Sequence, residues 1–130
     1  MACGAVISLL DTQHRCSCHW WLPDAGFPQH LASLLGGALT RSGGPPRSRL
    51  ELQTVFQPLR RLPDPETTPA ASSATYRYLI CLDRRGSRLS CWRRYPEGMG
   101  WQRRCGPMPL AQFIRRFDPA RTLPTGTPTH

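Results

Sequence analysis

Residues 75–95 read TYRYLICLDRRGSRLSCWRRY, and the stretch divides into two strand-like halves around a short polar segment. Every second residue from Tyr76 to Leu82 is a tyrosine, an isoleucine or a leucine, which is the period-2 pattern of a half-buried β-strand. The central RRGS supplies a glycine where a hairpin turn requires a positive φ. We therefore predict a β-hairpin with residues 84–87 as its loop, a register that places Ile80 opposite Cys91.

The chain then continues PEGMGWQRRCGPMPLAQFIRRF to residue 117. Its first part predicts a short third strand or a loop, and its second part predicts a helix that covers the apolar face of the hairpin. Pro109 suits the first helical turn, and Asp118 followed by proline ends the helix. Four apolar residues recur at the spacing of one helical face, namely Leu110, Phe113, Ile114 and Phe117.

The N-terminal part of the chain has a similar order of features. Residues 5–10 and 15–22 predict two paired strands, and residues 27–35 predict a helix that ends at Gly36-Gly37. ISLLD at 7–11 is similar to LICLD at 79–83, and each is followed by a strand with a cysteine and then a proline and an acid. Either an internal duplication or convergent turn chemistry accounts for this similarity.

These patterns predict an α+β fold of two small ββα units, each a hairpin followed by a helix, joined by a proline-rich linker. The alternation of Leu50, Leu52, Thr54 and Phe56 predicts one further strand after the first unit. The predicted divisions are an N-terminal unit with this strand at 1–57, a linker at 58–74, a basic unit at 75–118 and a disordered tail at 119–130.

The positive charge is concentrated toward the C-terminus. The net charge of +9 comes from 17 basic residues, all of them arginine, and the chain contains no lysine. Residues 1–40 carry a net charge of −1, residues 41–74 carry +2, and residues 75–130 carry +8. Either codon usage in a GC-rich genome or avoidance of lysine modification accounts for the lysine-free composition. Codon usage does not explain why the charge is concentrated in one part of the chain.

The outer face of the predicted hairpin places arginines around a tryptophan. Such a surface can stack nucleobases and neutralise phosphates, so we expect nucleic acid or another polyanion as the partner. The competing interpretation is a solvated basic face with Trp92 buried. The candidate binding residues are Arg77, Arg88, Trp92, Arg94, Arg103, Arg104, Arg115 and Arg116.

A second candidate site is a weak zinc cluster within residues 14–19. Cysteine and histidine are the ligands that structural zinc prefers, although the spacing lacks the usual pair of cysteines two residues apart. The competing interpretation is a pair of core cysteines beside a turn histidine. The candidate ligands are His14, Cys16, Cys18 and His19.

Carboxylates, histidines and glycines form no spacing typical of catalysis or phosphate cradling, and we expect a non-enzymatic accessory or regulatory protein, with a viral origin among the options. No stretch resembles a signal peptide or a membrane span, so we expect an intracellular protein, cytoplasmic or nuclear, with its cysteines as thiols.

The alternative function is a protein-interaction adaptor that docks through an apolar patch of Trp20, Trp21, Trp92 and Trp101.

Overall fold

The computed structural model describes residues 4–23, 27–42, 48–95, 98 and 100–118. Within these residues, six strands form a mixed sheet in the spatial order β3-β2-β1-β4-β5-β6. The central strands β1 and β4 are parallel, and the other neighbouring strands are antiparallel. The strands are β1 (Ala5–Asp11), β2 (Cys16–Leu22), β3 (Arg60–Leu62), β4 (Tyr76–Asp83), β5 (Gly86–Tyr95) and β6 (Gly100–Pro109).

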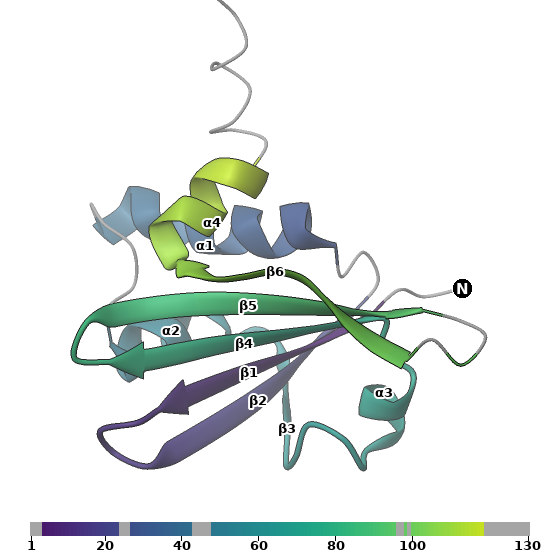
Figure 1. Cartoon of the computed structure of the whole chain (residues 1–130). Helices are drawn as coiled ribbons and strands as arrows, with labels where there is room; N and C mark the ends of the chain where they lie inside the picture. The colour runs from purple at the N-terminus through teal and green to yellow at the C-terminus, as the bar shows by residue number, and fades with distance from the viewer. Residues whose placement is uncertain (1–3, 24–26, 43–47, 96–97, 99, 119–130) are drawn as a thin grey trace, which may run out of the picture.

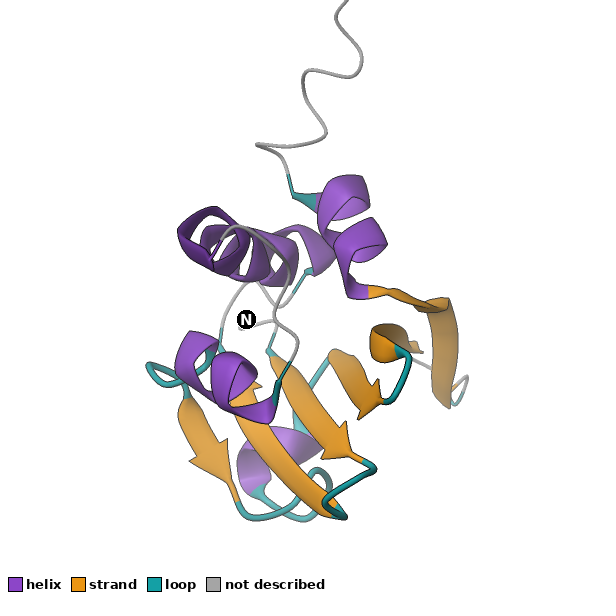
Figure 2. Cartoon of the chain, turned by 90° about the vertical axis from the view of Figure 1, so that its left-hand side faces the viewer, coloured by secondary structure: helices purple, strands orange, loops and turns teal. Residues whose placement is uncertain are grey.

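Helices pack on both faces of the sheet, but unequally. One face is covered by α1 (Pro28–Ser42), α2 (Arg49–Val55) and α4 (Leu110–Phe117). Figures 1 and 2 show α1 and α4 side by side over this face. The single turn α3 (Pro69–Ser72) lies against the opposite face, where Ala71 packs with Val6 and Leu62. Most of that second face is left without a helix, and we call it the open face.

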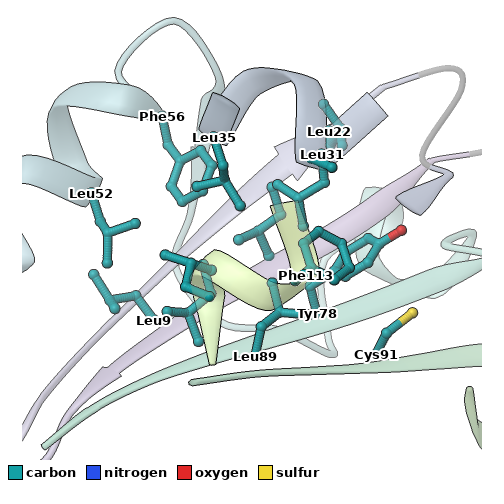
Figure 3. Close-up of a cluster of buried hydrophobic side chains, with 14 of the residues drawn as sticks. Leu9, Leu22, Leu31, Leu35, Leu52, Phe56, Tyr78, Leu89, Cys91 and Phe113 are labelled. Atoms are coloured by element: carbon teal, nitrogen blue, oxygen red, sulfur yellow. The ribbon is translucent and has the colours of Figure 1, made fainter. Parts of the chain in front are cut away.

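The core lies between the sheet and the three helices α1, α2 and α4. Every second residue of β1, β2 and β4 is buried there, and Figure 3 shows these side chains meeting those of the helices. Burying a large apolar side chain stabilises the fold by about 1.5–3 kcal/mol. The largest buried side chains include Ile7, Leu9, Leu35, Phe56, Tyr78 and Phe113.

The prediction of two separate ββα units is wrong. The two hairpins share one sheet through the parallel pairing of β1 with β4, and their helices share one core. Superposing the first hairpin on the second would require a half-turn about the strand axis, because β2 and β5 lie on opposite sides of the central pair. That rotation would place α1 and α4 on opposite faces, whereas both pack on the same face.

The sequence similarity between ISLLD and LICLD also aligns residues that face opposite sides of the sheet. It equates Ile7 with Leu79, but Ile7 is paired with Tyr78 and both of these side chains are buried under the helices. Leu79 instead lines the open face. The aligned residues therefore occupy different environments, one in the core and one at the open face.

The β4–β5 hairpin forms with a shorter loop than predicted. Ile80 pairs with Leu89, not with Cys91, because Asp83 pairs with Gly86 and the turn is only two residues long. Gly86 has a φ of +119°, a conformation that favours glycine. The register differs from the prediction by two residues, so the faces of the hairpin are assigned correctly.

Residues 50–56 form no strand. They belong to α2 and its C-cap, and Ser48 forms a capping box with Glu51. Leu52 and Phe56 are four residues apart and are both buried, so they meet the core on one helical face. The same apolar residues fit a strand or a helix, and the capping box is a local signal that favours the helix.

Several other boundaries differ from the predictions. The helix α1 continues through Gly36-Gly37 to Ser42, and the predicted linker contains β3 and α3. The strand β6 is ten residues long, and α4 forms as predicted. The predicted turn at 23–26 falls largely outside the described residues, as does the predicted tail at 119–130.

Candidate nucleic-acid interface

Tryptophans and arginines alternate across β4, β5 and β6 on the open face. The register pairs Arg77 with Trp92, Trp92 with Arg103, and Arg94 with Trp101. These five residues define what we call the Arg/Trp surface. Because side chains of one face recur every second residue along a strand, the alternation in sequence becomes a two-dimensional array on the sheet.

The arginines of this surface stack on its indoles. The guanidinium carbon of Arg94 lies 4.7 Å from the ring centroid of Trp101, and that of Arg77 lies 5.4 Å from the same ring. The guanidinium of Arg103 lies 5.9 Å from Trp92. Each contact stabilises the pair by about 0.5–1 kcal/mol at an exposed position and holds a cation beside an aromatic ring.

Two of these arginines also contact residues in α3 or in the loop before it. Arg94 donates a hydrogen bond to the carbonyl oxygen of Ser72, with a length of 2.7 Å. Arg77 forms a longer ion pair, 3.4 Å, with Glu66, whose side chain is 68% exposed. Such an exposed ion pair is weak, so Arg77 can exchange Glu66 for a phosphate at little cost.

A pocket of about 400 Å³ opens on the same face, beside the Arg/Trp surface. Arg77, Trp92 and Trp101 line it on one side, and β1 and β2 line it on the other. The remaining lining residues are largely apolar or small, and comprise Ser8, Leu9, Leu10, Ser17, His19, Pro65, Tyr78 and Leu79.

The polar groups at this pocket include a serine–histidine pair. The Ser8 hydroxyl lies 2.8 Å from Nδ1 of His19, within hydrogen-bond distance. Burial lowers the pKa of His19, and the positive charges of Arg61 and Arg77 lower it further, against an opposing effect of Asp64. His19 is therefore neutral near pH 7 and offers one donor and one acceptor nitrogen.

The structure divides the predicted binding residues between the two sides of the sheet. Arg77, Trp92, Arg94 and Arg103 lie together on the Arg/Trp surface. Arg88 is on the same face, where it pairs with Cys81. It is four residues from Trp92 along β5, which corresponds to about 13 Å.

The other three predicted residues lie on the helix side. Arg104 is the extra residue of a β-bulge in β6, and it donates a hydrogen bond of 2.7 Å to the Tyr95 hydroxyl. Arg115 and Arg116 are exposed on α4. Neighbouring strand residues point to opposite sides, so Arg103 and Arg104 cannot both lie on the Arg/Trp surface.

Trp101 and the Ser8–His19 pair were not among the predicted binding residues. The alternation of Trp101 with Arg103 along β6 was a usable signal for Trp101. The pocket depends on β1 lying beside β4, which are separated by more than 60 residues, and no local pattern indicates that neighbour.

The proposed zinc ligands are not brought together. Cys18 is buried in the core, while His19 lies on the open face, because neighbouring strand residues point to opposite sides. His14 instead lies 2.8 Å from Asp11 in the β1–β2 turn. In the described part of the chain, no group of three or more metal-binding side chains occurs.

The four tryptophans do not gather into one apolar patch. Trp20 is 3% exposed and packs against Phe56 in the core. Trp21 and Trp101 both pack against the small apolar cluster under α3, and Trp92 and Trp101 are also stacked with arginines. The predicted patch of four tryptophans therefore loses Trp20, which lies in the core.

A pair of thiols connects β5 and β6 behind the Arg/Trp surface. Cys91 is buried and lies directly opposite the half-buried Cys105. A hydrogen bond from Cys91, helped by the charges of Arg116 and Arg104, lowers the pKa of Cys105 to about 7, although partial burial opposes this. The same hydrogen bond, together with burial, raises the pKa of Cys91. Cys105 is therefore the thiol of this pair that ionises.

No family model, curated protein or solved structure matches the chain. Among the described helices, none is long and apolar enough to cross a membrane.

Proposed function

We propose that the protein is a small non-enzymatic accessory or regulatory module that binds nucleic acid through the Arg/Trp surface. The observation that carries the proposal is the alternation of arginine and tryptophan across three adjacent strands of a sheet face that α1, α2 and α4 leave open. Aromatic rings on an open sheet stack bases, and the arginines between them neutralise phosphates. We place this activity inside the cell, in the cytoplasm or the nucleus.

The charge distribution supports the same partner. Residues 75–130 carry a net charge of +8, and the ion pair of Arg77 with Glu66 on the open face is exposed. A field of this size attracts polyanions and accelerates their encounter with the surface. The Arg/Trp surface then supplies the short-range contacts that charge alone does not give.

The test compares arginines of similar exposure on the two sides of the sheet. Arg103→Ala removes a charge from the Arg/Trp surface, whereas Arg115→Ala removes one from α4. We expect Arg103→Ala to weaken binding of a labelled single-stranded oligonucleotide and to reduce the salt dependence by about one ion contact. Arg115→Ala should leave both nearly unchanged, and fluorescence anisotropy across a salt series measures them.

Trp92→Ala separates stacking from charge. Loss of one stacked base should weaken oligonucleotide binding by about tenfold at constant salt slope. Circular dichroism of each variant checks that the sheet is intact. If Trp92→Ala and Arg103→Ala both bind as the unaltered protein does, the proposal fails, and a protein partner becomes the better account.

A further inference from the structure

The pocket on the open face is continuous with the Arg/Trp surface. Arg77, Trp92 and Trp101 belong to both, so a strand whose phosphates contact this surface passes the mouth of the pocket. Its volume of about 400 Å³ falls in the range of roughly 300–1,000 Å³ typical of small-molecule sites. The pocket is therefore large enough to hold one part of a bound polymer.

The lining of the pocket suits a flat, partly polar ring. Indole and aliphatic side chains supply the apolar walls, and Leu79 lies between the β1–β2 side and the tryptophan side. Ser8 and His19 add hydrogen-bonding groups on the β1–β2 side. A nucleobase has this combination of an apolar face and a polar edge.

The Ser8–His19 pair can serve bases of different hydrogen-bonding pattern. If the serine donates to Nδ1, the other histidine nitrogen is a donor and the serine oxygen accepts; in the other tautomer these roles are exchanged. In both tautomers the pair offers one donor and one acceptor. This adaptability favours a site that accepts several bases rather than one.

We propose that this pocket holds an unpaired nucleobase, so that the ligand of the protein is single-stranded nucleic acid. The inference rests on the proposed function and specifies its substrate. A base within a duplex is stacked on both faces and paired at its edge, so it cannot enter a pocket without leaving the helix. A base in a single strand is free to turn into the pocket while its phosphates remain on the arginines.

The experiment uses three probes of equal length: a single-stranded oligonucleotide, an abasic strand with the same phosphates, and a duplex. We expect the single strand to bind the unaltered protein about tenfold more tightly than the abasic strand, since stacking of one base accounts for about that factor. The duplex should bind more weakly than the single strand. Equal affinity for the single and abasic strands would overturn the inference and the stacking of a base on Trp92, but would leave standing the binding of phosphates by the arginines. Failure of all three probes would overturn the proposed function itself.

Substitutions at the pocket give an independent test. Ser8→Val narrows the pocket and removes the hydrogen bond to His19, so the base-bearing strand should bind only as well as the abasic one. His19→Gln should weaken binding of the base-bearing strand by about fivefold, the value of one hydrogen bond. His14→Gln, in the adjacent turn and outside the pocket, is the matched control and should have no effect. Unchanged affinity in both pocket variants, with melting temperatures confirming their folds, would contradict the assignment.

Discussion

Arg93 is a charged residue at a position where the alternation of β5 predicts a side chain that faces the core. It pairs with Tyr76 and lies on the helix side of β5, where most neighbouring side chains are apolar. Its guanidinium carbon lies 5.2 Å from the ring of Tyr95 and 5.8 Å from that of Tyr76. A guanidinium is planar and only weakly hydrated, so aromatic rings at the edge of a core can accommodate it where they would not accommodate an ammonium group.

Cys105 gives a prediction at the same scale. Because its pKa is lowered to about 7 and that of Cys81 is raised, chiefly by burial, the two half-buried thiols should react differently with an alkylating agent. We expect the alkylation rate of Cys105 to rise through about pH 7 and then level off, while Cys81 reacts appreciably only at higher pH. Peptide mass mapping after short exposures measures both rates, and equal pH profiles would refute the proposed thiol pairing.

At the scale of elements, local patterns predicted the strands β1, β2, β4 and β5 and the helix α4. They did not predict strand order, because alternation specifies which face a residue occupies but not which strand lies beside it. The apolar residues of α2 fit the periods of both a strand and a helix, which is why alternation predicted a strand, and the Ser48–Glu51 capping box is the local signal for the helix. The alternation of the predicted hairpin correctly assigned four residues to the open face: Arg77, Arg88, Trp92 and Arg94. A register error of two residues does not change the face on which a residue lies.

The sharing of one sheet leads to a prediction about fragments. β4 lies at the centre of the sheet, so residues 75–118 alone would expose one edge of β4 and would lose the core contacts with β1, α1 and α2. We expect this fragment to be largely unfolded by circular dichroism, and addition of a fragment of residues 1–74 to restore sheet structure. A fragment of residues 75–118 that folds cooperatively by itself would contradict the shared core and support two independent units.

At the scale of the whole molecule, the sheet separates two chemically different sides. One side carries the core and its three helices, with Arg115 and Arg116 at its outer surface; the other carries the Arg/Trp surface and the pocket. The overall charge of +9 predicted a polyanion partner but not this separation, because a net charge does not say on which side of the sheet the arginines lie. The parallel contact between β1 and β4 brings the pocket and the Arg/Trp surface together, and it joins segments that are distant in sequence.

The most direct measurement of the central claim is a two-dimensional NMR titration of the indole N–H signals with a single-stranded oligonucleotide. The four tryptophans report four positions: Trp20 in the core, Trp21 under α3, and Trp92 and Trp101 on the Arg/Trp surface. Binding at the Arg/Trp surface predicts large shifts for Trp92 and Trp101 and an almost unmoved signal for Trp20. Saturable binding that leaves Trp92 and Trp101 unshifted would contradict the account, because the nucleic acid would then contact a different side of the molecule.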